Sequence, residues 1–231
     1  MTSREAFLDR VRKAVAAGNR AGIVHPLPDR NGVGYQGAGS DPLERFEIEW
    51  KAAGGQLHLL HDADAARAKV LDLIQTHQVR KILLGSDPLL TTLDLQQFLQ
   101  QRGLEVIKVQ DLEAATSPEP FFAADIGISG VDFLIAETGS LVMRSAPNQP
   151  RSISLLPPVH IAIAERRQLV PDLFDLFHKT SEFSQDFGSL ASALPSCLTL
   201  ITGPSKTGDI ELRLVTGVHG PGTVHVLMLD S

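Results

Sequence analysis

The residues best suited to bind a small anion are gathered near the end of the chain, in the glycine-rich segment 203–222. The segment follows the apolar run 196–202, SCLTLIT, which predicts a strand. Directly after that strand the chain offers two hydroxyls, Ser205 and Thr207, and the ammonium of Lys206. Such groups at the carboxyl end of a strand are typical of ligand sites in open α/β sheets. We therefore expect an anion-binding site here.

The same segment continues with two carboxylates, Asp209 and Glu211, and then with His219 between glycines. An imidazole in this position is a candidate general acid or base. The order of lysine and glycines does not match the P-loop, so the spacing gives no support to an ATPase. A glycine-rich hairpin with solvated charges is the alternative that the spacing leaves open.

A second candidate site is AETGS, residues 136–140. Glu137 ends an apolar strand, where desolvation would raise its pKa into a range useful for acid–base chemistry. Thr138 and Gly139 add a hydroxyl and an open backbone, and Arg144 in the next loop could clamp a carboxylate or phosphate with its planar fork. The alternatives are a tight turn and a solvated loop.

Other kinds of chemistry have no signature in the sequence. The histidines show no HExxH spacing, and neither a GxSxG nor a GxGxxG motif opens a helix, so we expect no metal site and no nucleotide cofactor. One cysteine, Cys197, cannot ligate an iron–sulfur cluster by itself. The net charge of −6 argues against nucleic acid. A charged N-terminus and the lack of a long apolar run predict a cytoplasmic protein without a membrane span.

The elements that must position these residues follow an alternating pattern. A helix is expected over 2–17 and a flexible arm over 18–40, followed by one α/β domain over 41–231. Within this domain, strands alternate with helices, which predicts a mostly parallel, doubly wound sheet. The first strands are expected at 56–60, 80–85 and 104–109. A helix that begins at Asp41 precedes them, and the helices between them begin at Asp62 and at Ser86-Asp87-Pro88.

The second half of the domain is richer in strands. The runs 131–137 and 140–144 flank Thr138-Gly139 and predict a hairpin. Further β-rich runs are expected at 151–156, 159–164 and 224–229, with a helix over 170–182.

Three blocks together, ADIGISGVDFLIAETGSLVM, RSISLLPPVHIAI and GPSKTGDIELRLVTGVHGP, resemble the LUD-domain family of lactate-utilisation protein C and its YkgG-like relatives. The resemblance implies a Rossmann-like, three-layer fold of the NagB/RpiA/CoA-transferase-like group, related to 5-formyltetrahydrofolate cyclo-ligase. It also implies a role in oxidising L-lactate to pyruvate beside partner subunits that carry iron–sulfur clusters. Because this chain lacks the ferredoxin-like cysteines, it looks like the short, cluster-free subunit, with no cofactor of its own.

No catalytic residue set comes with the resemblance, so only motif positions carry over. In the family's blocks these positions are Glu137, Thr138, Gly139, Gly203, Ser205, Lys206, Asp209, Glu211, His219 and Gly220.

Three hypotheses of function stay open. The first is a subunit of a lactate-oxidising system that binds a small anionic metabolite. The second is a stand-alone enzyme of acyl, CoA or nucleotide chemistry, with Glu137 as acid, base or nucleophile; its only support is analogy of fold. The third is a non-catalytic module that binds a metabolite and regulates partners. A homo-oligomer is compatible with each of them.

Overall fold

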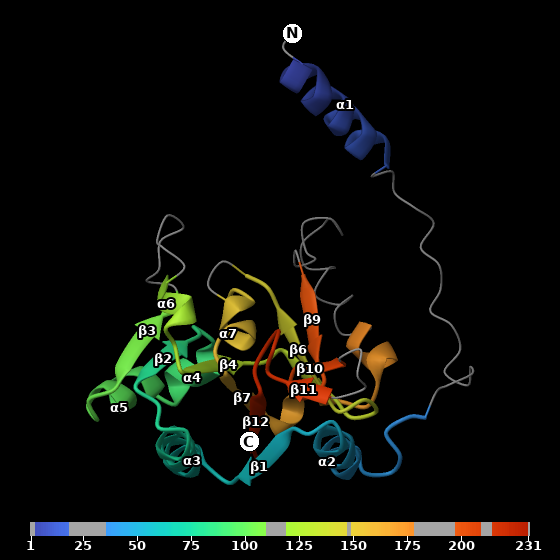
Figure 1. Cartoon of the computed structure of the whole chain (residues 1–231). Coiled ribbons are helices and arrows are strands. Elements are labelled where there is room, and N and C mark those ends of the chain that lie inside the picture. Colours follow the sequence, from blue (N-terminus) through green and yellow to red (C-terminus); the bar gives the residue numbers. More distant parts are fainter. Residues whose placement is uncertain are drawn as a thin grey trace. The chain divides into compact units, whose positions relative to one another are not determined.

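The computed structural model describes residues 3–18, 36–109, 119–146, 149–177, 197–208 and 214–230. Its contacts divide the chain into two units, Met1–Tyr35 and Gln36–Ser231. The first unit holds helix α1, Ser3–Gly18, close to the helix expected from the sequence. Most of the predicted arm, residues 19–35, lies outside the described residues. All other described elements belong to the second unit (Figure 1).

The second unit is built on a six-stranded sheet. Every neighbouring pair of its strands is parallel, which confirms the predicted α/β class with a mostly parallel sheet. In spatial order the strands are β1 (Gln56–Leu60), β12 (Thr223–Leu229), β7 (Val159–Glu165), β4 (Ile126–Gly130), β2 (Lys81–Leu84) and β3 (Glu105–Lys108).

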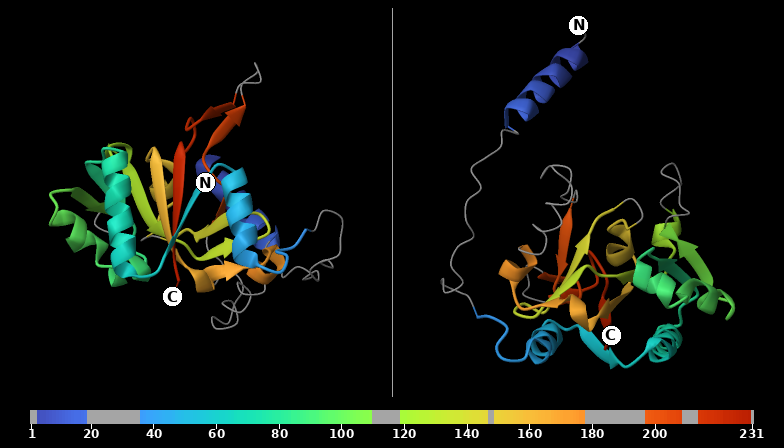
Figure 2. Two further views of the ribbon diagram at one scale, coloured as in Figure 1. Left: turned by 90° about the horizontal axis from the view of Figure 1, so that it is seen from below. Right: turned by 180° about the vertical axis from the view of Figure 1, so that it is seen from behind.

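Alternating side chains of the central strand β7 face cores on opposite faces of the sheet. Ile161 and Ile163 of β7 face the core that includes α3 (Ala63–Thr76), α4 (Pro88–Thr92) and α5 (Leu95–Gln100). Ala162 and Ala164 face the other core, which includes α2 (Pro42–Ala52) and a smaller sheet. Figure 2 shows α2 and α3 on opposite sides of β1. Burial on both faces explains why these strands are nearly uninterrupted apolar runs.

The helices begin at the residues that the sequence predicts. Asp41 accepts hydrogen bonds from the N–H of Leu43 (2.9 Å), and Asp62 from that of Ala65 (2.8 Å). Asp87 accepts from the N–H of Leu89 at 2.8 Å, with Pro88 in the first helical turn. An aspartate that satisfies free N–H groups of the first turn is a strong helix N-cap.

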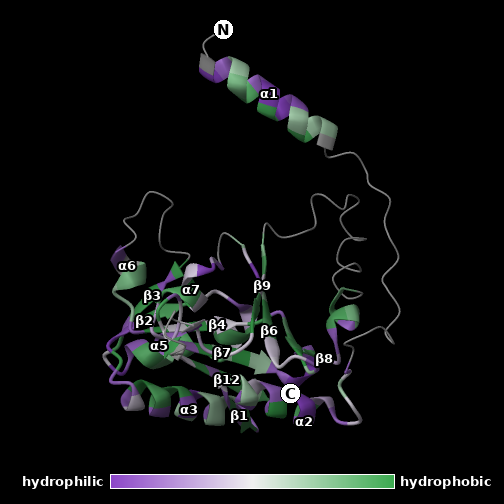
Figure 3. Ribbon diagram, turned by 45° about the vertical axis from the view of Figure 1, so that its right-hand side comes forward, coloured by the Kyte–Doolittle hydropathy of each residue, from purple (hydrophilic) through white to green (hydrophobic). Residues whose placement is uncertain are grey.

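The smaller sheet contains β8 (Leu169–Val170), β5 (Phe133–Ile135), β6 (Ser140–Arg144) and β9 (Leu198–Ile201). Strands β5 and β6 form the predicted antiparallel hairpin. The apolar run before the glycine-rich segment becomes β9 and pairs antiparallel with β6, so it lies outside the central parallel sheet. The segment itself forms a separate ribbon of β10 (Lys206–Gly208) and β11 (Leu214–Thr216). Figure 3 shows hydrophobic residues along the strands of both sheets.

One predicted strand is wrong: part of the run 151–156 is the short helix α7, Ser152–Leu155. Only Ile153 of the run's large apolar side chains is fully buried, because one helical turn presents a single side chain to the sheet. The turn lies so close to β4 that a Cβ on Gly127 would be 2.0 Å from the carbonyl oxygen of Ile153.

Several other elements also differ from the sequence prediction. Strand β4 was not expected as a separate strand, since its IGISG sequence has glycines that hide the apolar pattern. Two further helical stretches, α6 (Glu119–Phe122) and the 3-10 turn Arg166–Gln168, are also present. Of the predicted helix 170–182, residues 173–177 are helical, and 178–182 lie outside the described part of the chain.

Candidate functional site

The carboxylate of Glu137 is held by backbone N–H groups. Glu137 follows β5 and its Oε1 accepts hydrogen bonds from the N–H of Gln36 (2.9 Å) and of Gly37 (3.1 Å). These contacts tie the segment that precedes α2 to the smaller sheet. Glu137 therefore has a structural role, and its catalytic role stays a prediction.

The two sequence blocks that suggested a site do lie together. The hydroxyl of Ser140 is 2.8 Å from that of Thr138 and 2.7 Å from that of Thr202, so a chain of hydroxyls joins the blocks. Gly139 and Gly203 have positive φ angles of 58° and 83°. Both pack closely on the second half of α2, because a Cβ on either glycine would lie within 3 Å of the backbone of that helix region.

The described residues of the glycine-rich segment make packing and capping contacts. The ammonium of Lys206 donates a hydrogen bond to the carbonyl oxygen of Ala53, at the C-terminus of α2. A cation there offsets the partial negative charge of the helix end. Ser205 closes the base of the ribbon, donating its N–H to Pro221 (2.9 Å) and accepting from Gly217 (3.0 Å).

The other residues predicted in this segment are dispersed. Thr207 lies in the ribbon, where it pairs with Val215. Gly220 packs on Ser205: a Cβ added at Gly220 would lie 3.2 Å from the Cβ of Ser205. His219 is exposed. Asp209 and Glu211 lie outside the described residues. The arrangement of the described part is that of a glycine-rich hairpin, the alternative that the spacing had left open.

Arg144 is engaged by a carboxylate of its own chain. Its Nε lies 2.6 Å from Oδ1 of Asp132, and its backbone N–H donates to Oδ2 at 2.6 Å. The side chain is 41% exposed while that of Asp132 is 15% exposed. An anionic ligand at Arg144 would therefore have to compete with this pair.

A second group of polar residues gathers at the carboxyl ends of the central strands. Asp87, Asp132 and Glu165 follow or end β2, β4 and β7, which are neighbours in the sheet. The absence of a side chain at Gly130 leaves room for the Asp87 carboxylate, because a Cβ at that glycine would lie 2.2 Å from the Asp87 carboxyl carbon. This is the edge at which parallel α/β sheets bind their ligands.

The three carboxylates have different surroundings. Asp132 pairs with Arg144, and Glu165 accepts from Nε of Arg167 at 2.8 Å. Burial raises the pKa of Asp87, and the nearby charges of Asp132 and Glu165 raise it further, whereas the bond from the Leu89 N–H lowers it. A carboxyl group with a raised pKa at a strand end is suited to donate or accept a proton.

Two hollows, each of about 120 Å³, lie at this same edge. The first lies between the ends of β2 and β3 and the α4–α5 turn, and the second lies over the ends of β1 and β12. The first is lined by Leu84, Gly85, Ser86, Leu90, Thr91, Asp94, Leu95, Gln96 and Lys108. The second is lined by Leu43, Leu59, Leu60, His61, Arg166, Met228, Leu229 and Asp230.

The residues of this edge are not among those that the sequence predicts for a site. Ser86, Asp87 and Pro88 are predicted only as the start of a helix, although they directly follow a predicted strand. Lys108 is predicted only as part of the strand 104–109, near whose carboxyl end it lies. The usable signal was the position of polar residues at the ends of strands that run parallel.

Three histidines that are far apart in sequence meet toward the other end of the central sheet. Nδ1 of His225 lies 3.3 Å from Nε2 of His58, and its Nε2 lies 3.1 Å from Nε2 of His77. Burial, together with these two neighbours, lowers the pKa of His225 to about 4. Each ring nitrogen of His225 therefore lies within hydrogen-bonding distance of a different histidine. In the described residues, no group of three or more His, Cys, Asp or Glu side chains is placed to hold a metal ion.

Fold and site together define the class of protein: an α/β domain whose parallel sheet carries a polar, hollowed edge at its carboxyl ends. The chain belongs to the LUD-domain family, since residues 43–229 match the model of the LUD domain. That match covers the central sheet and both polar regions described above.

Relatives match nearly the whole chain. It is 35% identical to lactate utilization protein C of Halalkalibacterium halodurans, over 94% of each chain. It is 37% identical to an uncharacterised protein of Neisseria meningitidis, over 99% of this chain and 94% of the relative. A crystal structure of a DUF162 family protein from Deinococcus radiodurans superposes with a TM-score of 0.58 at 18% identity. The superposition covers 82% of this chain and 96% of the Deinococcus radiodurans chain, and it supports the α/β fold described above.

A search of the described helices finds none that is both long and apolar enough to span a membrane.

Proposed function

We propose that this protein is a cluster-free subunit of an L-lactate utilisation system. The observation that carries the proposal is family membership across residues 43–229, together with relatives named lactate utilization protein C. The system as a whole would oxidise L-lactate to pyruvate, and this chain would contribute a domain that binds a small anionic metabolite.

Electron transfer is assigned to partner subunits in this proposal. An iron–sulfur cluster needs several thiolate ligands, and the chain has a single cysteine, Cys197. Partner proteins with cysteine-ligated clusters would therefore take the two electrons that leave lactate. The metabolite is assigned to the carboxyl edge of the central sheet, because both hollows lie there and both contain a cationic side chain, Lys108 or Arg166.

A stand-alone enzyme is the second candidate, and one observation favours it. Asp87 has a raised pKa and directly follows Ser86, which lines the first hollow. A proton-transferring carboxyl group beside a ligand hollow is a common feature of active sites. In this reading the isolated chain would catalyse acid–base chemistry on the bound metabolite.

The two candidates are separated by a reconstitution assay. Extract of a strain that lacks this protein is supplied with L-lactate and an artificial electron acceptor, and the purified chain is then added back. Under the proposal, acceptor reduction is restored by the chain in extract, and the chain alone reduces nothing. Acid–base chemistry passes no electrons to an acceptor, so the stand-alone enzyme is tested without one, by NMR of the chain incubated alone with L-lactate, a CoA ester or a nucleotide. Turnover there would support the stand-alone enzyme, and no turnover would contradict it. Equal rates of acceptor reduction in extract with and without the chain would contradict the subunit proposal.

A further inference from the structure

The hollow at the ends of β2 and β3 combines groups of opposite character. Leu84 and Lys108 are register partners at the carboxyl ends of these two strands. Gly85 and Ser86 continue β2 into the hollow, and the turn between α4 and α5 closes it with Asp94. The apolar floor comes from leucines, while the polar groups are two hydroxyls, the amide of Gln96, an ammonium and a carboxylate.

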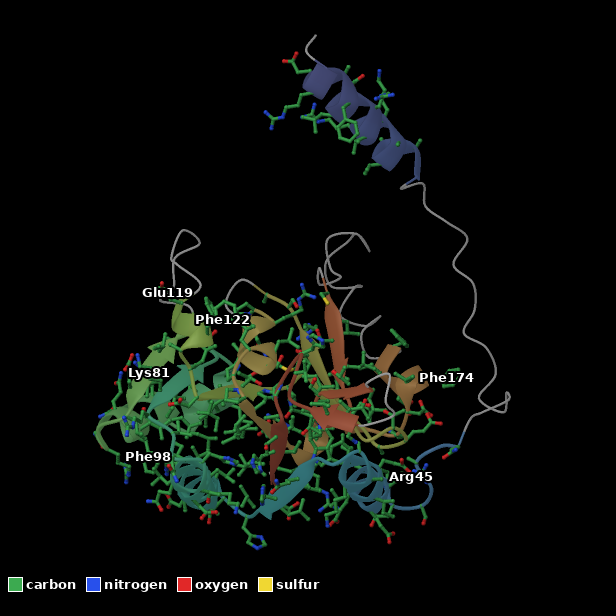
Figure 4. All side chains as sticks on the ribbon, viewed as in Figure 1. Arg45, Lys81, Phe98, Glu119, Phe122 and Phe174 are labelled. Atoms are coloured by element: carbon green, nitrogen blue, oxygen red, sulfur yellow. The ribbon has the colours of Figure 1, made fainter. Side chains whose placement is uncertain are left out.

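Lys108 supplies a positive charge that none of the described residues neutralises. Its side chain is half-buried, and within the described residues it makes no ion pair and no hydrogen bond. Lys81, labelled in Figure 4, gives the contrast at the opposite end of β2. Its ammonium lies 3.3 Å from the carboxylate of Glu105. A half-buried ammonium without a carboxylate partner is a ready donor to an anion that enters the hollow.

Asp94 lies in a backbone conformation that aspartate adopts only at some cost. Its φ of 48° and ψ of 35° are left-handed, which is uncommon for residues other than glycine. The main chain holds this conformation: its N–H donates to Thr91 (2.9 Å), and its carbonyl accepts from Phe98 (3.1 Å). Its side chain makes no capping hydrogen bond to α5. The carboxylate is therefore presented at the hollow without a partner among the described residues.

We infer that this hollow binds a small hydroxylated anion, whose anionic oxygens accept hydrogen bonds from Lys108 and whose hydroxyl donates to Asp94. Ser86 and Thr91 add hydroxyls to the lining. At about 120 Å³ the hollow is smaller than the roughly 300 Å³ at which pockets for drug-sized ligands begin, so it suits a small metabolite. The inference deepens the proposed function, on which it rests for the metabolite-binding role, by naming the site and the ligand class.

Binding to the full chain is measured by isothermal titration calorimetry with L-lactate, with propionate, which lacks the hydroxyl, and with glycerol 3-phosphate. Lactate and glycerol 3-phosphate distinguish a carboxylate from a phosphate as the anionic group. We expect one of them to bind, and Lys108→Met to weaken it by about tenfold or more, as loss of a charge-assisted hydrogen bond does. Lys81→Met, the matched control at the other end of the strands, should leave affinity unchanged.

The variant Asp94→Gly separates binding from folding. Glycine adopts the left-handed conformation without strain, so the melting temperature should equal or exceed that of the wild type. The affinity for the hydroxylated anion should nevertheless fall, and for a carboxylate the preference for lactate over propionate should disappear.

The inference is overturned if none of the three anions binds, or if Lys108→Met binds as tightly as the wild type. Wild-type preference for the hydroxylated anion in Asp94→Gly would equally refute the role of Asp94. The reconstitution assay tests the proposed function separately. Binding that depends on Lys108 and Asp94, with no effect of the chain on lactate oxidation, would keep the site and reject the lactate role.

Discussion

Acid should destabilise this protein through His160, which is fully buried in β7. Its Nε2 lies 2.9 Å from the Ser129 hydroxyl, and its Nδ1 is buried without a hydrogen-bond partner. Burial lowers the pKa of His160 from 6.5 to about 4. A depressed pKa means that the folded protein resists protonation more than the unfolded chain does. Stability is therefore fully present above pH 6.5 and is lost as the pH falls toward 4.

The size of the effect follows from the shift. One pKa unit corresponds to about 1.4 kcal/mol, so the neutral His160 accounts for roughly 3 kcal/mol of pH-dependent stability. Roughly 2–3 kcal/mol of this should be gone at pH 4.5. The loss is a large part of the 5–15 kcal/mol that is typical of a whole domain.

The assay is urea unfolding at pH 7 and pH 4.5 of the wild type and His160→Gln. Glutamine keeps a hydrogen-bonding group near Ser129 and does not titrate in this range. The variant should lose roughly 2–3 kcal/mol less than the wild type between the two pH values, although His225 still contributes a loss in both. His61→Gln, at an exposed histidine, is the control. If His160→Gln and the wild type lose the same free energy, burial of a neutral imidazole at this position is refuted.

Two further predictions concern close packing and capping. Gly127→Ala should destabilise the protein by about 1–3 kcal/mol in urea unfolding, because its Cβ would lie 2.0 Å from the carbonyl oxygen of Ile153. Gly208→Ala, the control, has open space around the new Cβ and should lower the free energy of unfolding far less. Equal losses in the two variants would contradict the close contact at Gly127. Lys206→Met should lower the free energy of unfolding by up to about 1 kcal/mol, because the hydrogen bond to Ala53 at the end of α2 is lost. The loss should be smaller at high salt. A loss that does not depend on salt would argue against an electrostatic interaction with the helix end.

Local patterns predicted much of the fold. The aspartates before α2, α3 and α4 cap these helices as expected, since a cap depends only on residues within one turn. The β5–β6 hairpin was also predicted, because its turn and its two apolar runs are adjacent in sequence. The prediction failed at 151–156, where the helix forms because it packs on Gly127, a residue that no local pattern connects with it.

The residues of the candidate site were likewise predicted only in part. The sequence identified two glycine-rich blocks, and the structure brings them together on α2 through Gly139 and Gly203. Whether Glu137 or Lys206 also binds a ligand stays a prediction, since both already bond to the backbone. The polar edge with Asp87 and Lys108 was not selected, because its residues come from separate strands and share no motif.

The amino-acid sequence by itself determined the family, the α/β class and the position of most helices and strands, because periodicity, caps and turns are properties of neighbouring residues. The tertiary structure alone decided which side chains meet. Asp87, Asp132 and Glu165 share one edge only because β2, β4 and β7 are neighbours in the sheet. His58, His77 and His225 come together only because β1 pairs with β12 and α3 ends beside them. Strand order and register are set by packing over the whole domain, and these long-range contacts have no signature in any short stretch of sequence.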